Sequence, residues 1–554
     1  MINSKFNLIY NIKLITERVL KKVPWLYNLK LYIKYLIRLK YNLEKQLSFK
    51  SSKPAIKDNC KRVLIPAIET SHYQFHQILI TAKAMKLRGA EVKVLVCDSF
   101  LKGCEIKNSK DSKLADPCLN CNFNQNHILD YYGLDVILLS SIFSNEDIDF
   151  IKKKSADLLS KEKKYFNKFD LTRIVNESVT RHFYGANAKS KKDHDNVIYN
   201  HLFTSITSYM AAKKINDLFK PNIIFNSMNV YSSWEPYYNY FSEVPNVDLF
   251  TLSITAFNYN AVILNQMDLY KSPKRFYDYL STRNNKNLIK SERHKLYDFL
   301  NTRKSGDSKI FLDHEYYKKD SKVEEVLSLD ENKNNIFLFS NIYWDVGLSE
   351  SGRLYNDVID WVLDTIDIVS KIKNTHLYIK IHPAEEFDSS SSLKGVKDFI
   401  YEKYSTLPDY LSLIVPEMKI NPSELFPFID IAILFNGTLG LEVLFENIPV
   451  IITGKAPYSN LKLVNEPINK IEYKNLLNGS KKLINPKKKD YELFAYYYFI
   501  KTCIPWNLTK SAYADDFKGF TFDTLEDILP GKNKYLDHVC NCILKSSDTN
   551  IDNW

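Results

Sequence analysis

The chain of 554 residues is poor in glycine, with 14 in all, and it contains no long uninterrupted apolar run. No stretch reaches the roughly 18 apolar residues that a membrane-spanning helix needs. The N-terminus also lacks an apolar segment followed by a small-residue cleavage site, so it does not resemble a secretory signal peptide. We therefore expect a cytoplasmic protein that can lie on a membrane but does not cross one.

Cysteine is scarce as well, with eight residues, and in a chain without a signal peptide we expect thiols in place of a disulfide framework. Four of them cluster in the sequence: Cys97, Cys104, Cys118 and Cys121. The last two have half of a zinc-ribbon spacing, but the six residues between the first two do not supply a second close pair. A structural zinc site is thus the weaker interpretation, and we expect no tightly bound cofactor.

Positive charge is concentrated at one end of the chain. The formal net charge is +11, and residues 1–53 hold twelve Lys or Arg against only Glu17 and Glu44. The remainder is close to neutral, which argues against a nucleic-acid-binding enzyme with a basic cleft. Apolar residues recur there at helical spacing, so residues 1–58 are predicted to form basic amphipathic helices. Such an extension either contacts an anionic membrane surface, as in a peripheral membrane protein, or packs on the body with its lysines in water.

The rest of the composition is that of a soluble globular protein, with 45% hydrophobic and 25% charged residues, in a chain too long for one core. Apolar strands alternate with helical stretches in residues 59–260 and again in 335–490, which predicts parallel sheets with helices on both faces. We expect an α/β fold of two Rossmann-like domains facing a central cleft. A helical inter-domain region, 261–334, and a helical tail, 491–554, complete the predicted organisation.

Two motifs follow predicted strands, and ligands bind parallel sheets at the carboxyl ends of their strands. In the first, the strand ending at Lys380 and Ile381 leads into His382, Pro383 and Glu385. An imidazole there can donate a hydrogen bond to a phosphate and, when protonated, neutralise its charge. The alternative is a capping histidine that binds no ligand.

The second motif is a strand, a small-residue turn and the start of a helix, around Gly437. Backbone N–H groups of such a turn can face a phosphate, and a carboxylate one helical turn later can accept both hydroxyls of a ribose. The alternative is a capped helix with a surface glutamate, because Gly-containing turns are weakly specific. The residues predicted to bind a ligand here are Asn436, Gly437, Thr438, Gly440 and Glu442, with Gly454 and Tyr458 on the loop after the next strand.

These motifs lie in segments that resemble capsule polysaccharide biosynthesis proteins, GT-B glycosyltransferases related to the bacterial capsule Kdo transferases. The resemblance covers residues 336–459, in the order FLFSNIYWDVG, DWVLDTI, LYIKIHPAEE, VPEMKINPSELF and FNGTLGLEVLFENIPVIITGKAPYS. Upstream, CDSFLKGCEI and PCLNCNF are similar to a cysteine-bearing segment of that group. IIFNSMNV resembles one of its Asn-containing loops, with Ser227 where Gly is expected and Asn229 where Arg is expected.

The resemblance implies a nucleotide-sugar donor, CMP-, UDP- or GDP-linked, held by the C-terminal domain. It matches His382 and Pro383 to a His-Pro motif that contacts the donor phosphate, Gly437 and Thr438 to the phosphate turn, and Glu442 to a ribose-binding acid. We predict acceptor contacts from Asn226, Asn229, Asn341 and Trp344. The candidate bases are Glu69, His72 and Asp345, which the sequence does not rank.

The expected activity is transfer of a sugar from a nucleotide-sugar to a growing capsular or lipopolysaccharide chain or its lipid-linked precursor. No Asp-x-Asp motif stands at a strand end, which favours metal-independent transfer. Three alternatives stay open: a nucleotide-sugar 2-epimerase, a polyol-phosphate transferase and a catalytically silent assembly subunit. The sequence leaves undecided the donor, the acceptor and the stereochemistry of transfer.

Overall fold

The computed structural model describes residues 60–68, 75–108, 132–255, 258–266, 273–305, 332–345, 353–355, 357–386, 391–509 and 524–545, with a few single residues elsewhere. The predicted basic extension, residues 1–58, lies almost wholly outside these ranges. Within them, no helix has the length and apolar character needed to span a bilayer.

The N-terminal domain is built on a seven-stranded sheet of order β14-β8-β7-β6-β1-β2-β3. Its five parallel strands are β1 (Arg62–Pro66), β2 (Glu91–Val96), β3 (Asp135–Leu138), β6 (Ile223–Asn226) and β7 (Asp248–Thr255). The antiparallel strands β8 (Asn258–Gln266) and β14 (Ile504–Pro505) extend one edge. The central strands are buried on both faces, as helices on the two sides of a parallel sheet require.

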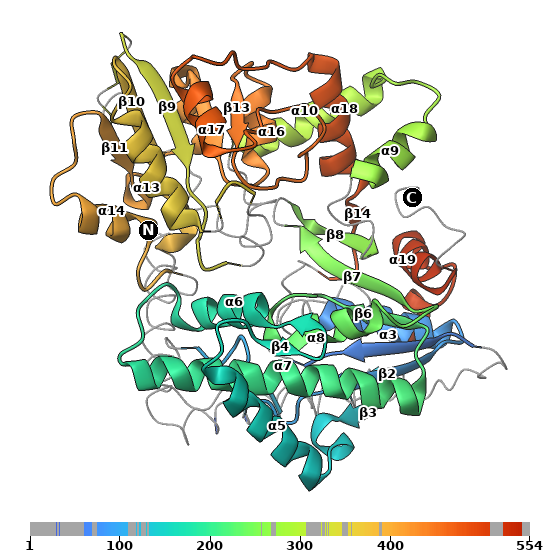
Figure 1. The fold of residues 1–554 in the computed structure, drawn as a ribbon. Helices are drawn as coiled ribbons and strands as arrows, with labels where there is room; N and C mark the ends of the chain where they lie inside the picture. The colour runs from blue at the N-terminus through green and yellow to red at the C-terminus, as the bar shows by residue number, and fades with distance from the viewer. Residues whose placement is uncertain are drawn as a thin grey trace.

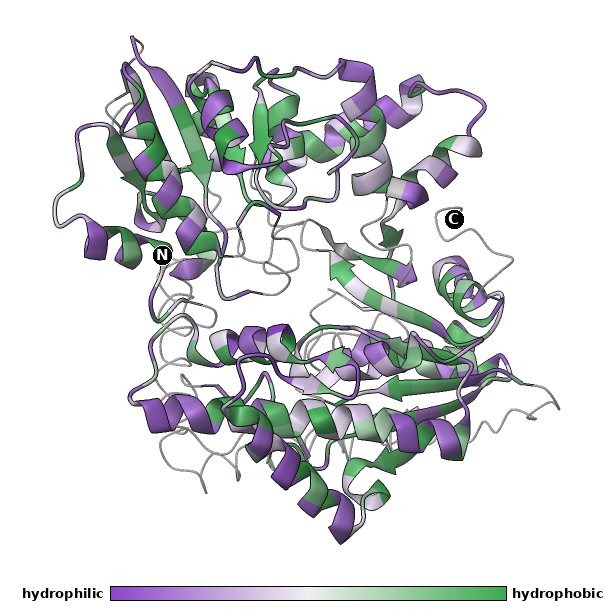
Figure 2. Cartoon of the chain, in the orientation of Figure 1, coloured by the Kyte–Doolittle hydropathy of each residue, from purple (hydrophilic) through white to green (hydrophobic). Residues whose placement is uncertain are grey.

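Helices cover both faces of this sheet (Figure 1). On one side, α3 (Phe75–Leu87) and the C-terminal helix α19 (Lys534–Lys545) share a core. The other side has α5 (Asn145–Leu159), α6 (Thr172–Phe183), α7 (Lys191–Phe219) and α8 (Tyr231–Phe241), with η1 (Leu139–Ile142) and the small hairpin of β4 (Tyr165–Phe166) and β5 (Phe169–Asp170). Figure 2 shows mainly hydrophobic strands and hydrophilic outer faces on α5 and α7.

The C-terminal domain contains a five-stranded, fully parallel sheet of order β11-β10-β9-β12-β13. The strands are β9 (Asn334–Phe339), β10 (Thr375–Lys380), β11 (Leu411–Ile414), β12 (Ile431–Leu434) and β13 (Val450–Ile452). One face is covered by α13 (Val358–Val369), α14 (Val396–Lys403) and α17 (Lys470–Leu477). The other is covered by α9 (Pro273–Ser281), α10 (Lys290–Lys304), α15 (Pro422–Leu425), α16 (Leu439–Leu444) and α18 (Lys488–Tyr496).

The five parallel strands of each sheet follow the same doubly wound order, in which the third, second, first, fourth and fifth strands of the chain lie side by side. The chain direction across the sheet reverses between the first and fourth strands, which are β1 and β6 in one domain and β9 and β12 in the other. Ligand sites of such sheets are found at this reversal. The predicted pair of Rossmann-like domains is therefore confirmed.

Two segments depart from their predicted helical character. The region 261–334 begins inside the strand β8, whose Val262 and Leu264 are buried in the core of the N-terminal domain. The tail 491–554 crosses back to the N-terminal domain, because β14 pairs with β8 and α19 packs on α3. The buried residues of α19, among them Leu536, Val539 and Ile543, recur at helical spacing, which explains this packing.

Candidate functional site

The carboxyl ends of β9 and β12 are joined by two asparagine side chains. Asn341 follows β9 and donates from Nδ2 to Oδ1 of Asn436, which follows β12, over 3.1 Å. Asn341 Oδ1 is buried and accepts no hydrogen bond within the described part of the chain. Buried acceptors are nearly always satisfied, so an orphan oxygen at the strand reversal marks a place where a group from outside the protein can donate.

His382 lies at the same edge, directly after β10. Its backbone N–H donates to Ser340 Oγ over 3.1 Å, and its Nδ1 accepts from the backbone N–H of Ala384 over 3.2 Å. Because Nδ1 is an acceptor, the ring proton belongs on Nε2. Burial, aided by the Lys380 ammonium, lowers the pKa of His382 to about 4. His382 is therefore a neutral hydrogen-bond donor at neutral pH.

Lys380 is a buried cation two residues before His382. It is only 4% exposed, and this burial lowers the pKa of its ammonium to about 8, although Glu424 acts in the opposite direction. A buried lysine is costly unless a negative charge compensates it. Its position beneath the strand ends makes it a source of positive potential for an anionic ligand.

The turn after β12 leads into α16, in the order strand, turn and helix that the sequence predicts. Gly437 adopts φ +116°, and a Cβ there would meet nothing within 4 Å, so the backbone conformation and not crowding requires glycine. Gly440 differs, because a Cβ there would overlap the hydroxyl of Tyr458. Tyr458 is fully buried and donates to the carbonyl of Gly437 over 2.9 Å. Tyr458 thus supports the turn from below.

Glu442, the predicted ribose acceptor, is held by Arg303 of α10. Arg303 donates to Oε1 of Glu442 from Nε over 3.0 Å and from Nη2 over 2.7 Å, and both side chains are about nine-tenths buried. The two partners are 139 residues apart in the sequence. A ribose bound here would share this carboxylate with Arg303.

The remaining predicted donor residues have mainly structural surroundings. Glu385 is 3% exposed, and both of its carboxylate oxygens accept from the backbone N–H of Val396 at the start of α14, at 3.0 and 3.3 Å. Burial raises the pKa of Glu385 to about 8, although this hydrogen bond opposes the rise. Pro383 is buried at the start of a short 3₁₀ turn, and Gly454 donates its N–H to Phe435 beside β12.

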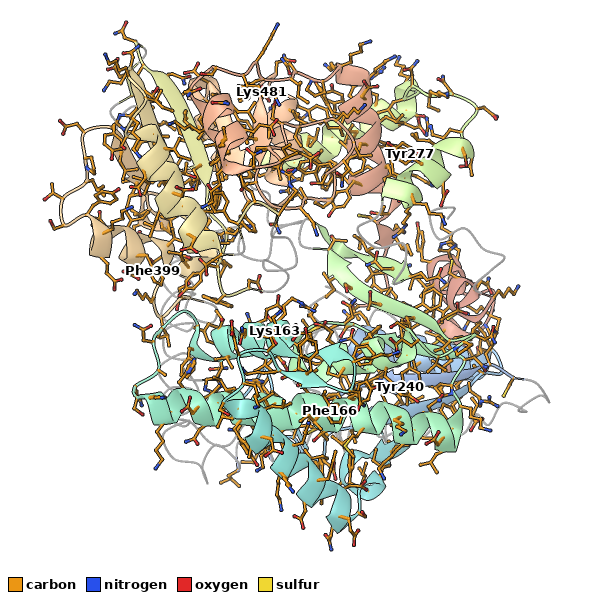
Figure 3. The ribbon with its side chains drawn as sticks, in the orientation of Figure 1. Lys163, Phe166, Tyr240, Tyr277, Phe399 and Lys481 are labelled. Carbon is orange, nitrogen blue, oxygen red and sulfur yellow. The ribbon has the colours of Figure 1, made fainter. Side chains whose placement is uncertain are left out.

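Trp344 and Asp345, on the loop after β9, lie against the N-terminal domain. Trp344 is buried, donates from Nε1 to Ser392 over 2.8 Å, and its ring centroid lies 4.6 Å from that of Tyr184. Asp345 Oδ1 lies 3.8 Å from Nη1 of Arg181. This loop therefore joins the edge of the C-terminal sheet to α6 of the other domain, on the side where Phe399 is labelled in Figure 3.

Asn226 ends β6 at the reversal of the N-terminal sheet. Its Nδ2 donates to the carbonyl of Pro66 over 2.6 Å, and its Oδ1 accepts from the N–H of Ser227 over 2.7 Å. It is 3% exposed, so its amide holds β1 and β6 together at their carboxyl ends. Asn229, on the loop to α8, is partly exposed.

A polar cluster that was not predicted from the sequence lies beside this loop. Tyr231, the first residue of α8, has φ +65°, is 3% exposed, and its hydroxyl has no hydrogen-bond partner among the described residues. Burial raises its pKa well above the usual range, and the charges of Arg181, Asp345 and Glu105 also act on it. Ser233 donates to Oε2 of Glu105 over 2.8 Å. These residues come from distant segments, and only the position of Tyr231 after a strand could have signalled it.

The remaining predictions concern two candidate bases and the clustered cysteines. Glu69 and His72 lie outside the described residues. The clustered cysteines are all buried, and burial raises the pKa of Cys97 to about 12. In the part of the chain that the structure describes, no group of three or more His, Cys, Asp or Glu side chains could hold a metal ion.

No family model matches the chain, and no curated protein matches it. Solved structures do, at low similarity. A KpsC β-Kdo 2,4 transferase of Thermosulfurimonas dismutans is 14% identical, covering 49% of this chain and 78% of that chain, with a TM-score of 0.35. A glycosyltransferase of Rickettsia africae is 13% identical, covering 88% and 100%, with a TM-score of 0.25. A putative UDP-N-acetylglucosamine 2-epimerase of Listeria monocytogenes is 10% identical, covering 80% and 97%, with a TM-score of 0.23.

The class of the fold follows from the connectivity of the chain itself. Each domain has five parallel strands in doubly wound order, helices on both faces and a strand reversal at its carboxyl edge. The last strand and helix of the chain return to the first domain, which ties the two domains together twice. The chain therefore has a GT-B-type fold.

Proposed function

We propose that this protein is a metal-independent glycosyltransferase that moves a sugar from a nucleotide-sugar to a growing surface polysaccharide or its lipid-linked precursor. The observation that carries the proposal is the convergence of Asn341, His382 and Asn436 on the strand reversal of the C-terminal sheet. An orphan acceptor, a neutral imidazole donor and a glycine turn at the start of a helix there suit a nucleotide bearing phosphates.

The donor half of the reaction needs groups that receive the negative charge of the departing nucleotide. His382 can donate from Nε2, the turn at Gly437 can donate from its backbone, and the buried Lys380 adds positive potential. All three act as hydrogen-bond donors or cations. This set fits stabilisation of the leaving group by the protein's own residues.

The acceptor half is assigned to the polar cluster of the N-terminal domain. Tyr231 and Arg181 offer donors to saccharide hydroxyls, and Glu105 and Asp345 offer carboxylates that can accept a proton from one of them. Asp345 was a candidate base from the sequence, and its ion pair with Arg181 brings it to this cluster. Glu69 and His72 stay candidates on sequence grounds alone.

Nucleotide binding tests the proposal directly. The full chain is heated with CMP, UDP, GDP, CDP and their sugar conjugates, because a ligand that binds only the folded state raises the melting temperature. We expect one nucleotide family to raise it by a few degrees. His382→Ala should lose this shift. His376→Ala is the matched control, because His376 is a buried histidine at the opposite end of β10, bonded to Ser412.

The products distinguish the remaining alternatives. Transfer of the sugar to a saccharide acceptor supports the proposal, whereas release of a 2-epimer without any acceptor replaces it with the epimerase. Transfer of a polyol phosphate from a CDP conjugate identifies the polyol-phosphate transferase. If no nucleotide shifts the melting temperature, the silent-subunit alternative takes precedence.

A further inference from the structure

Residues 468–489 of the C-terminal domain, here the Lys/Ile patch, combine exposed isoleucines with a dense positive charge. Ile468 is 82% exposed, Ile471 is 73% exposed and Ile484 is 46% exposed. The patch contains seven exposed lysines and Glu472 as its one acid. The lysines are Lys470, Lys474, Lys481, Lys482, Lys487, Lys488 and Lys489.

The isoleucines are held outward by the structure around them. Ile468 precedes the N-cap of α17, and its N–H donates to Oε2 of Glu472 over 2.8 Å. An apolar residue at this position usually packs on the first turns of its own helix, but Ile468 stays in solvent. Ile471 follows on the outer side of α17, because Tyr473 and Leu476 occupy the buried side.

The loop that carries Ile484 is fixed as well. The side-chain amide of Asn465 accepts from the N–H of Ile484 over 2.8 Å and donates to its carbonyl over 3.3 Å. Asn465 in turn is bridged to Ile451 of β13. The loop with the exposed Ile484 is thus held next to β13, the edge strand of the sheet.

Most of the positive charge of the patch is not compensated. Lys481 pairs with Glu472, Lys470 lies 3.2 Å from Asp364, and Lys488 lies 4.0 Å from Glu492. The other four lysines form no ion pair with any described residue: Lys474, Lys482, Lys487 and Lys489. The same segment therefore combines exposed isoleucines with an excess of unpaired positive charge.

We propose that the Lys/Ile patch docks on an anionic lipid surface. Lysines attract acidic headgroups, and isoleucines gain free energy by entering the boundary between headgroups and acyl chains. A nucleic acid would use the lysines but leave the isoleucines in water, so lipid fits the whole patch better. Lys481 lies on the side of the C-terminal domain that faces away from the N-terminal domain (Figure 3). The inference is independent of the proposed glycosyl transfer and of the extension 1–58.

Co-sedimentation of the full chain with vesicles tests the proposal. Vesicles of phosphatidylcholine mixed with phosphatidylglycerol are compared with vesicles of phosphatidylcholine alone. The test variant changes Lys474, Lys482, Lys487 and Lys489 to Glu. The matched control makes the same change of charge on the N-terminal domain, at the exposed lysines Lys153, Lys163, Lys191 and Lys192.

We expect the wild type and the control to bind the anionic vesicles, and the test variant to bind them on the order of several hundredfold more weakly, since each of the four lysines contributes about fivefold. A second variant, Ile468→Asn with Ile471→Asn, keeps the charges and should weaken binding even at high salt, where attraction between charges is screened. Both variants should keep the wild-type melting temperature and nucleotide shift, because the changed side chains are exposed.

Three outcomes would overturn the proposal. Equal loss in the test variant and the control would show that only net charge matters. Unchanged binding of the test variant would place the lipid contact elsewhere in the chain. Loss of self-association in the isoleucine variant, measured by size-exclusion chromatography without vesicles, would make the patch an interface between copies of this protein.

Discussion

The two sheets share one strand order, yet their carboxyl edges differ in hydrogen bonding. At the N-terminal edge, both polar groups of the Asn226 amide are used, on Pro66 and Ser227. At the C-terminal edge, Asn436 is bonded to Asn341, whose Oδ1 keeps no partner among the described residues. The asparagine at the N-terminal edge is thus satisfied within the protein, whereas the asparagine pair at the C-terminal edge has an acceptor to spare. We assign the nucleotide to the second.

The edges also differ in titratable groups, and this gives the largest expected effect. The C-terminal edge carries Glu385, whose pKa burial raises to about 8. A carboxyl with a raised pKa contributes stability that is complete below pH 4.5 and is lost as pH rises through 8. The wild type should therefore lose stability relative to Glu385→Gln between pH 6.5 and pH 8, by about 2 kcal/mol. Urea titrations of both proteins across this range measure it.

The titration of His382 does not contribute to the change in stability expected above pH 6.5. Its lowered pKa, about 4, makes the folded state bind fewer protons than the unfolded state between pH 4 and pH 6.5. Its contribution to stability therefore rises with pH in that window and is constant above it. A parallel response of wild type and Glu385→Gln above pH 6.5 would contradict the buried carboxylic acid.

The next largest effect is expected at Gly440, which packs against Tyr458 beneath the turn after β12. In Gly440→Ala the new methyl overlaps the Tyr458 hydroxyl, so we expect a loss of about 2 kcal/mol in unfolding free energy and weaker nucleotide binding. Tyr458→Phe removes the overlapping oxygen, so the double variant should recover part of the loss, measured by a double-mutant cycle. Additive effects of the two substitutions would show that the loss in Gly440→Ala does not come from contact with the Tyr458 hydroxyl.

Substitutions of Asn226 and Asn341 test the difference in hydrogen bonding between the two edges. Asn226→Ala removes the hydrogen bond from β6 to Pro66 of β1 and the local one from Ser227, and should cost about 2 kcal/mol of stability without changing nucleotide affinity. Asn341→Ala should cost about 1 kcal/mol but lower nucleotide affinity about tenfold, because the orphan oxygen is lost. Calorimetric titration with the nucleotide found by the thermal panel separates the two. Reversed effects would exchange the roles of the edges.

Local sequence pattern was sufficient for the strands and for what directly follows them. Apolar runs end where β10 and β12 end, so His382 and Gly437 could be placed at strand ends from the sequence. The conformation of Gly437 also follows from its residue type, since φ +116° suits only glycine. These predictions depend on neighbouring residues alone.

The partners of these residues could not be predicted in the same way. Glu442 meets Arg303 across 139 residues, and Tyr458 reaches under Gly437 from a later loop. Asp345 meets Arg181 only because the two domains touch. Each contact depends on how helices and loops pack over the sheets, and no periodicity in the sequence specifies that packing.

The smallest expected effect lies in the N-terminal domain and tests whether it supplies the acceptor site. Tyr231→Phe removes a buried hydroxyl that has no partner among the described residues, so stability should stay within about 0.5 kcal/mol of wild type or rise slightly. Nucleotide affinity should be unchanged, because Tyr231 follows β6 and not the C-terminal strands. With a saccharide acceptor, turnover should fall while donor hydrolysis by water continues at the wild-type rate. Equal losses of both reactions would assign Tyr231 to the donor half, and unchanged transfer would remove this cluster from the acceptor site.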